Sequence, residues 1–111
     1  MKKIKIKYKK IEKLTDNYEE WLVDSLRNKN EAALYLKVAL EEYQKDGCIE
    51  AFTLALRDIA KAQGGFTKLA DKTNLNREAL YRSLSKNGNP SLKTLRSLLN
   101  ALGFKLDIKK A

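Results

Sequence analysis

Residues 66–90 constrain the fold of this chain more than any other stretch. Phe66 and Leu69 mark the inner face of one short helix, and Leu80 marks the inner face of a second. Between the two lies Asn74, at a position where the turn needs a left-handed backbone conformation. Asparagine tolerates that conformation better than most residues do. The stretch therefore predicts two short helices joined by a tight turn, a helix-turn-helix.

The second predicted helix begins with polar and charged side chains that point away from the core. In a helix-turn-helix, this end of the second helix enters the major groove of DNA. Arginine can pair with guanine, asparagine with adenine and glutamate with cytosine, while tyrosine can meet a thymine methyl group or a phosphate. Glu78 also suits the dipole of its own helix, and Asn76 also suits the N-cap. The candidates for DNA contact are Asn76, Arg77, Glu78, Tyr81 and Arg82.

Two other helix starts offer groups that suit the phosphate backbone of DNA. Thr67 and Lys68 lie at the start of the first short helix, where backbone amides and the helix dipole favour anions. Ser91 and Lys93 lie at the start of the last predicted helix, after a strong turn signal at residues 87–90. We expect these four residues to contact phosphates.

The charge of the chain is divided unevenly along its length. The net charge is +9 over 111 residues. Residues 1–13 carry seven lysines and one glutamate, and residues 51–111 carry twelve basic and four acidic groups. A basic C-terminal half suits a polyanion, because neutralised phosphates release their counterions. Residues 14–50 carry nine acidic and four basic groups, which suits a basic protein partner or an ordinary solvated face.

Helical periodicity continues on both sides of the helix-turn-helix. Asp16, with Glu19 three residues later, fits a capping box that opens a first helix. Apolar residues at helical spacing predict further helices over residues 32–43 and 49–63, and a last helix that stops at Gly103. The core of the chain is therefore expected to be all-α, with about six helices.

The two ends of the chain alternate with period two instead. Ile4 and Ile6 lie between lysines, and Leu106 and Ile108 alternate with Lys105 and Asp107 in the same way. We expect a short terminal β-strand at one or both ends, which needs a partner edge because a single strand is not stable. For residues 1–13, a basic tail or an arm on DNA remains as an alternative.

Several functional classes are disfavoured by what the chain lacks. It contains no histidine, the commonest general base and zinc ligand, and no glycine-rich phosphate loop. We therefore expect no enzyme, and no catalytic, metal or cofactor site. No apolar run is long enough to span a membrane, and the start of the chain lacks the features of a secretory signal. The lone Cys48 fits a reducing compartment, so we expect a cytoplasmic protein.

The segments TKLADKTNLNREALYRSLSKNGNPSL and LLNALGFKL resemble the lambda-repressor-like helix-turn-helix fold. With YEEWLVDSLRN, EAALYLKVALEE and EAFTLALRDIAKAQGG, the resemblance narrows to the HigA-like antitoxins, or addiction module antidote proteins, and covers about residues 18–106. Asn74 departs from the glycine that many such turns carry. The resemblance implies a homodimer that masks a RelE/ParE-like toxin and binds operator DNA as a repressor, with residues 76–78, 81 and 82 as its DNA readers.

No compact motif marks the toxin contacts, so the acidic middle and the N-terminal strand are candidates for them on physical grounds only, from the pattern of charge and periodicity. Residues 1–13 form a basic strand or tail, residues 14–47 an acidic helical segment that is a candidate for toxin binding, and residues 48–111 the helix-turn-helix domain with its closing strand. A stand-alone repressor without a toxin, of the kind found in prophages, is the alternative. A short basic gene beside this one would distinguish the two.

Overall fold

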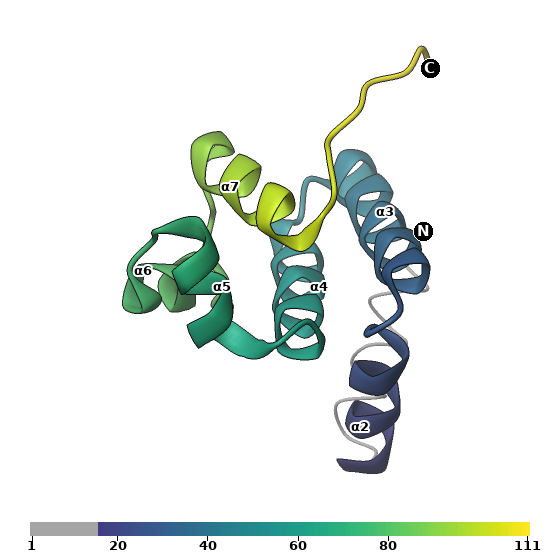
Figure 1. The fold of residues 1–111 in the computed structure, drawn as a ribbon. Helices are drawn as coiled ribbons and strands as arrows, with labels where there is room; N and C mark the ends of the chain where they lie inside the picture. The colour runs from purple at the N-terminus through teal and green to yellow at the C-terminus, as the bar shows by residue number, and fades with distance from the viewer. Residues whose placement is uncertain (1–15) are drawn as a thin grey trace.

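The computed structural model describes residues 16–111, with side chains from residue 18 onward. The strand, tail or DNA arm expected for residues 1–13 lies outside these residues. Six helices make up the described chain, as the all-α prediction required (Figure 1). They are α2 (Asp16–Ser25), α3 (Lys29–Asp46), α4 (Ile49–Ala62), α5 (Gly65–Thr73), α6 (Arg77–Ser83) and α7 (Leu92–Leu102).

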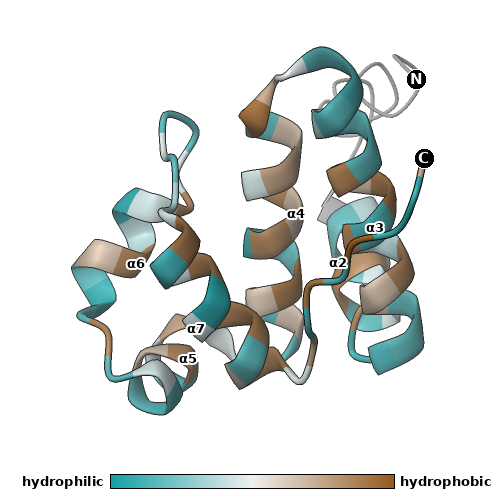
Figure 2. Cartoon of the chain, turned by 90° about the horizontal axis from the view of Figure 1, so that it is seen from above, coloured by the Kyte–Doolittle hydropathy of each residue, from teal (hydrophilic) through white to brown (hydrophobic). Residues whose placement is uncertain are grey.

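Helix α4 lies at the centre of the fold, and most of its side chains are buried. Helices α2 and α3 pack on it from one side, while α5 packs on it from the other and carries α6 and α7 (Figures 1 and 2). Phe52, Leu56 and Ile59 supply the predicted apolar face of α4 and are all in the core. Burial of such side chains is the main favourable term in folding. The helices of the acidic segment and helices α5, α6 and α7 therefore contribute to one apolar core.

The helix ends follow local sequence signals. The side chain of Asn28 accepts hydrogen bonds from the backbone N–H groups of Asn30 and Glu31, which caps α3. Gly47 and Gly103 end α3 and α7 with positive φ angles of 69° and 85°, where glycine is least strained. Helix α3 extends beyond the predicted range of residues 32–43 at both ends, and α2 ends at Ser25.

The C-terminal strand expected over residues 104–109 is absent from the described chain. Residues 104–111 form neither helix nor strand; Phe104 packs against the core, and the end of the segment extends away from the helices (Figure 1). A β-strand is stable only when a second strand pairs with its backbone groups, and the described residues contain no strand that could do so. The alternation of Phe104, Leu106 and Ile108 was therefore not enough to make a strand within this single chain.

None of the described helices has the length and apolar content needed to cross a membrane.

Candidate nucleic-acid interface

The turn between α5 and α6 has the geometry that the sequence predicted. Asn74 has φ 57° and ψ 23°, and it is the only non-glycine residue of the described chain with a positive φ. The hydroxyl of Thr73 donates a hydrogen bond to the carbonyl of Leu69 at 2.8 Å and accepts one from the backbone N–H of Leu75 at 3.3 Å. The turn thereby sets the direction in which α6 leaves α5.

Asn76 caps the start of α6. Its side-chain oxygen accepts hydrogen bonds from the backbone N–H groups of Glu78 at 2.7 Å and Ala79 at 3.4 Å. The cap satisfies two N–H groups that otherwise have no partner within the helix. Because the oxygen is used in this way, the side-chain NH2 group is the part of Asn76 that suits a DNA acceptor.

Tyr81 is held in place by neighbours on both helices. Its ring stacks on that of Phe66 in α5, with centroids 4.4 Å apart and ring planes at 22°. The guanidinium carbon of Arg77 lies 5.8 Å from the centroid of the Tyr81 ring, within cation–π range. Tyr81 is nevertheless 49% exposed, whereas Phe66 is buried. Part of the Tyr81 ring therefore packs against Phe66, and the rest faces solvent.

The remaining predicted residues are exposed but differ in what surrounds them. Arg77, Glu78 and Arg82 are exposed on α6, and Thr67 and Lys68 are exposed on the first turn of α5. The stem of Lys68 passes so close to Gly64 that a Cβ at that glycine would lie 2.6 Å from its Cδ. Helices α5 and α6 pack on each other, so the structure brings the two sets of side chains to adjoining helices.

Ser91 and Lys93 lie at the start of α7, as expected. The hydroxyl of Ser91 accepts a hydrogen bond from the backbone N–H of Thr94 at 3.1 Å and donates one to the Thr94 hydroxyl at 3.0 Å, so it caps the helix. Within the described chain, no hydrogen bond or ring contact joins Ser91 or Lys93 to α6. Ser91 and Lys93 therefore form a second group of candidate phosphate contacts, at the start of α7 and separate from the residues on α5 and α6.

Two residues that sequence reasoning missed support the far end of α6. The Nε–H of Arg57 on α4 donates a hydrogen bond to the carbonyl of Leu84 at 2.9 Å. Gly88 lies against the end of α6, where a Cβ would overlap the carbonyl oxygens of Arg82 and Ser83. The turn signal around Gly88 was visible in the sequence, but its close approach to α6 depends on tertiary packing.

A second surface of interest lies on α2. Glu19, Glu20 and Asp24 line an open depression of about 590 Å³ together with Val23 and Arg27. Trp21 is 61% exposed on the same helix and packs against Tyr18, with ring centroids 5.5 Å apart. Trp21 does not line the depression, and two of its acids are paired within the chain, Glu19 with Lys61 at 3.3 Å and Asp24 with Arg27 at 3.2 Å. Helix α2 thus carries acidic side chains and an exposed aromatic ring.

Comparison with known proteins identifies the family. Residues 17–110 match the family model described as "Probable addiction module antidote protein". A protein of Haemophilus influenzae (strain ATCC 51907 / DSM 11121 / KW20 / Rd), described as "Uncharacterized protein", is 31% identical over 90 residues. The match covers 81% of this chain and 88% of that relative. No solved structure matches the chain significantly. Because the family model covers nearly the whole chain, the protein belongs to the addiction module antidote family.

Proposed function

We propose that this protein is the antitoxin of a type II toxin–antitoxin module, and that it masks a RelE/ParE-like toxin and represses its own operon as a homodimer. Family membership supports the antitoxin role. The observation that carries the DNA-binding role is the α5–α6 arrangement, in which a left-handed turn at Asn74 precedes a capped helix with an outward arginine at each end. A HigA-like subtype and a lambda-repressor-like fold are part of this proposal.

In the proposed complex, the start of α6 lies in the major groove. Arg77 and Arg82 pair with guanine edges, and Glu78 accepts a hydrogen bond from cytosine. Asn76 offers its side-chain NH2 group, and the Tyr81 hydroxyl meets a phosphate or base edge. Thr67, Lys68, Ser91 and Lys93 contact phosphates, which position the protein on the duplex. Two copies bind half-sites one helical turn apart, because a two-fold protein matches a pseudo-palindrome.

Toxin masking would use the acidic segment, residues 14–47. Ribonuclease toxins of this group are usually basic, so the carboxylates of Glu19, Glu20 and Asp24 suit such a partner. The exposed ring of Trp21 is the kind of side chain that dominates protein interfaces. Residues 48–111 would keep the DNA-binding role. Both segments share a core, so the division is one of surfaces.

The DNA-binding role is tested by replacing the two arginines of α6. Arg77→Ala combined with Arg82→Ala should weaken binding to the promoter DNA upstream of this gene by roughly a hundredfold or more, since each bidentate arginine–guanine pair contributes about 1–3 kcal/mol. Arg96→Ala removes the same side chain from an exposed position on α7 and is the matched control. Gel-shift titration measures the affinities, and circular dichroism checks the fold. Undiminished affinity of the double variant would refute the assignment.

The toxin-binding role is tested separately by co-expression with the product of the neighbouring gene. We expect a basic protein that co-purifies with this chain and still does so when Arg77 and Arg82 are replaced. Trp21→Ala combined with Glu20→Lys should weaken that complex without changing operator affinity. Salt should weaken operator binding more steeply than toxin binding, because only the former releases the condensed counterions of DNA. Equal salt dependence would contradict the use of separate surfaces.

A further inference from the structure

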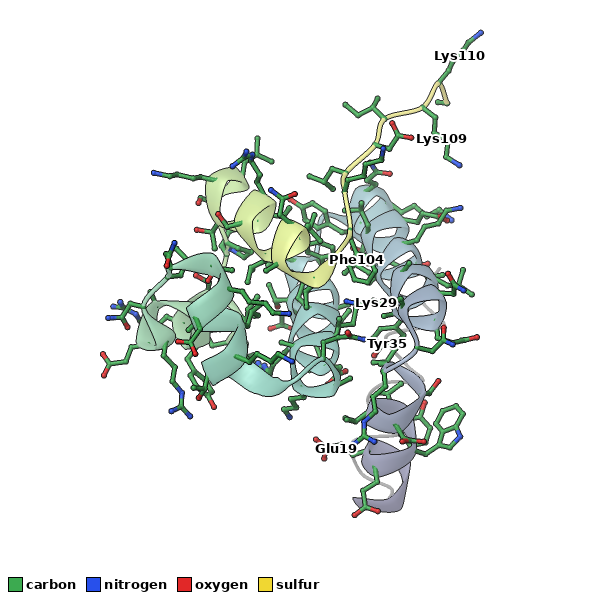
Figure 3. All side chains as sticks on the ribbon, in the orientation of Figure 1. Glu19, Lys29, Tyr35, Phe104, Lys109 and Lys110 are labelled. Carbon is green, nitrogen blue, oxygen red and sulfur yellow. The ribbon has the colours of Figure 1, made fainter. Side chains whose placement is uncertain are left out.

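The segment that follows α7 is anchored to the helices at Phe104. The backbone N–H of Phe104 donates a hydrogen bond to the carbonyl of Leu99 at 2.8 Å, and its half-buried ring packs against the core. The ammonium of Lys29 on α3 lies 5.7 Å from the centroid of that ring and donates a hydrogen bond to the carbonyl of Leu102 at 2.6 Å. Phe104 and Lys29 lie side by side where the segment leaves the helices (Figure 3).

Beyond Phe104 the segment is exposed, and its one hydrogen bond within the described chain is local: the backbone N–H of Ile108 donates to the Asp107 carboxylate at 2.9 Å. Leu106 is 45% exposed and Ile108 is 95% exposed, although both are large apolar residues. No backbone–backbone hydrogen bond joins residues 105–111 to another part of the described chain. The segment extends away from α6 in both views of the fold (Figures 1 and 2). It is therefore an unpaired edge on the side of the molecule opposite the proposed DNA reader.

We propose that residues 104–108 pair with the same segment of a second copy, as an antiparallel two-stranded ribbon centred on Leu106. In this register Phe104 of one chain faces Ile108 of the other, and Leu106 faces its own counterpart. Lys105 faces Asp107 twice, once on each side of the two-fold axis. One face of the ribbon is then wholly apolar, and the other carries two ion pairs of opposite charge, both of which stabilise antiparallel pairs.

The charges select this register over its neighbours. A register centred on Asp107 places the two Asp107 side chains opposite each other and Lys105 opposite Lys109, and one centred on Lys105 brings the two Lys105 side chains together. Like charges directly opposite each other destabilise a strand pair. Registers centred between residues place apolar side chains opposite charged ones. A register centred on Ile108 also pairs Asp107 with Lys109, but it places Leu106 opposite Lys110. Of these registers, only the one centred on Leu106 pairs opposite charges on one face and apolar side chains on the other.

The same reasoning favours a second copy over the chain's own N-terminal segment. Residues 3, 5, 7 and 9 are all lysine, so that segment would bring lysines against Lys105 and Lys109. Pairing between copies is symmetric, with the same patch used on both chains. It deepens the homodimer of the proposed function, but it requires neither DNA nor toxin. Because the ribbon forms on the side away from α6, both α6 helices remain available.

A charge-swap experiment on the full-length protein tests the register. We expect a wild-type dimer by sedimentation equilibrium in low salt. Lys105→Asp, or Asp107→Lys, should each raise the dimer dissociation constant by roughly tenfold or more, because both ion pairs become repulsive. An equimolar mixture of these two variants should form a heterodimer. The Lys105→Asp chain carries aspartate at positions 105 and 107, the Asp107→Lys chain carries lysine at both, and each aspartate then faces a lysine. The double variant should dimerise like the wild type. Lys110→Asp, beyond the paired residues, should have no effect.

A crosslinking experiment tests the position of the axis. In a Cys48→Ser background, Leu106→Cys should form an intermolecular disulfide readily, because opposite Cβ atoms in a strand pair lie close to the distance that a disulfide needs. Lys110→Cys should crosslink slowly. A monomeric wild type, dimers insensitive to both charge reversals, or faster crosslinking at residue 110 would overturn the proposal. Because no DNA is present, these outcomes do not depend on the result with Arg77 and Arg82.

Discussion

The ring of Tyr81 on α6 stacks on the ring of Phe66 on α5, with the two centroids 4.4 Å apart. Phe66 is part of the core, whereas about half of Tyr81 is exposed. A side chain proposed to touch DNA is therefore also a structural link between the two helices of the motif. Offset-stacked aromatic pairs of this kind contribute about 0.5–1.5 kcal/mol beyond the burial of their area.

These two roles of Tyr81 can be separated by substitution. Tyr81→Phe keeps the ring stack, so the free energy of unfolding should change by less than about 0.5 kcal/mol. It removes the hydroxyl, so operator affinity should fall several-fold if that group bonds DNA. Tyr81→Ala should lower the free energy of unfolding by about 1 kcal/mol or more, because the stack is lost. Urea denaturation and gel-shift titration measure the two effects. A similar loss of stability in both variants would contradict the structural role of the ring.

Position 88 is predicted to accept only glycine, because the end of α6 leaves no room for a Cβ atom there. Gly88→Ala should lower the free energy of unfolding by about 2–3 kcal/mol, because the new Cβ would overlap the carbonyl oxygens of Arg82 and Ser83 and push the end of α6 aside. Operator affinity should fall as well. Gly47→Ala is the control: its Cβ would meet no atom within 4 Å, but its φ of 69° costs an L-residue about 1–2 kcal/mol. Gly47→Ala should leave operator affinity unchanged. Unchanged operator affinity in Gly88→Ala would contradict the prediction.

A buried acid lies between α3 and α4. The Tyr35 hydroxyl donates a hydrogen bond to the Asp58 carboxylate at 3.1 Å, and Asp58 is only 6% exposed. Burial raises the pKa of Asp58 to about 6. The hydrogen bond from Tyr35 and the positive charges of Lys61 and Arg57 lower this pKa, while the negative charge of Glu19 raises it. Burial is the largest of these causes, so the neutral form of Asp58 is the one that the fold favours.

This raised pKa makes stability depend on pH. Asp58 holds its proton more tightly in the folded than in the unfolded chain, so its contribution is fully present below about pH 4 and is lost as pH rises through about 6. The free energy of unfolding should decline across this window, by at most roughly 3 kcal/mol. Asp58→Asn should remove the decline, so the variant should exceed the wild type in stability at pH 7 but not at pH 4. Denaturation at several pH values measures this.

The control for this pH dependence is Asp71→Asn, which replaces an exposed carboxylate on α5. The decline between about pH 4 and 6 should persist in that variant. If Asp58→Asn retained the full decline, another group would have to be its source.

The features that the sequence predicted correctly depend on residues only a few positions apart. The left-handed turn at Asn74, the cap at Asn76 and the helix start at Ser91 were predicted from local signals, and the structure has all three. Each involves hydrogen bonds or backbone angles within about four residues, so no distant part of the chain is needed to specify it. The predicted apolar face of α4 was correct for a similar reason, because helical periodicity marks which side is buried.

The features that the sequence did not determine all involve contacts between distant residues. Asp58 looked like an ordinary charged residue until α3 covered it, and Gly88 looked like an ordinary turn glycine until the end of α6 lay against it. The C-terminal alternation predicted a strand, yet strand pairing depends on a partner that the described single chain does not supply. The sequence by itself determined the helical periodicity, the cap at Asn76 and the left-handed turn at Asn74, because local backbone chemistry decides them. Only the tertiary structure decided which polar groups are buried, which glycine needs its space and which edge is left unpaired, because these depend on what packs against each residue.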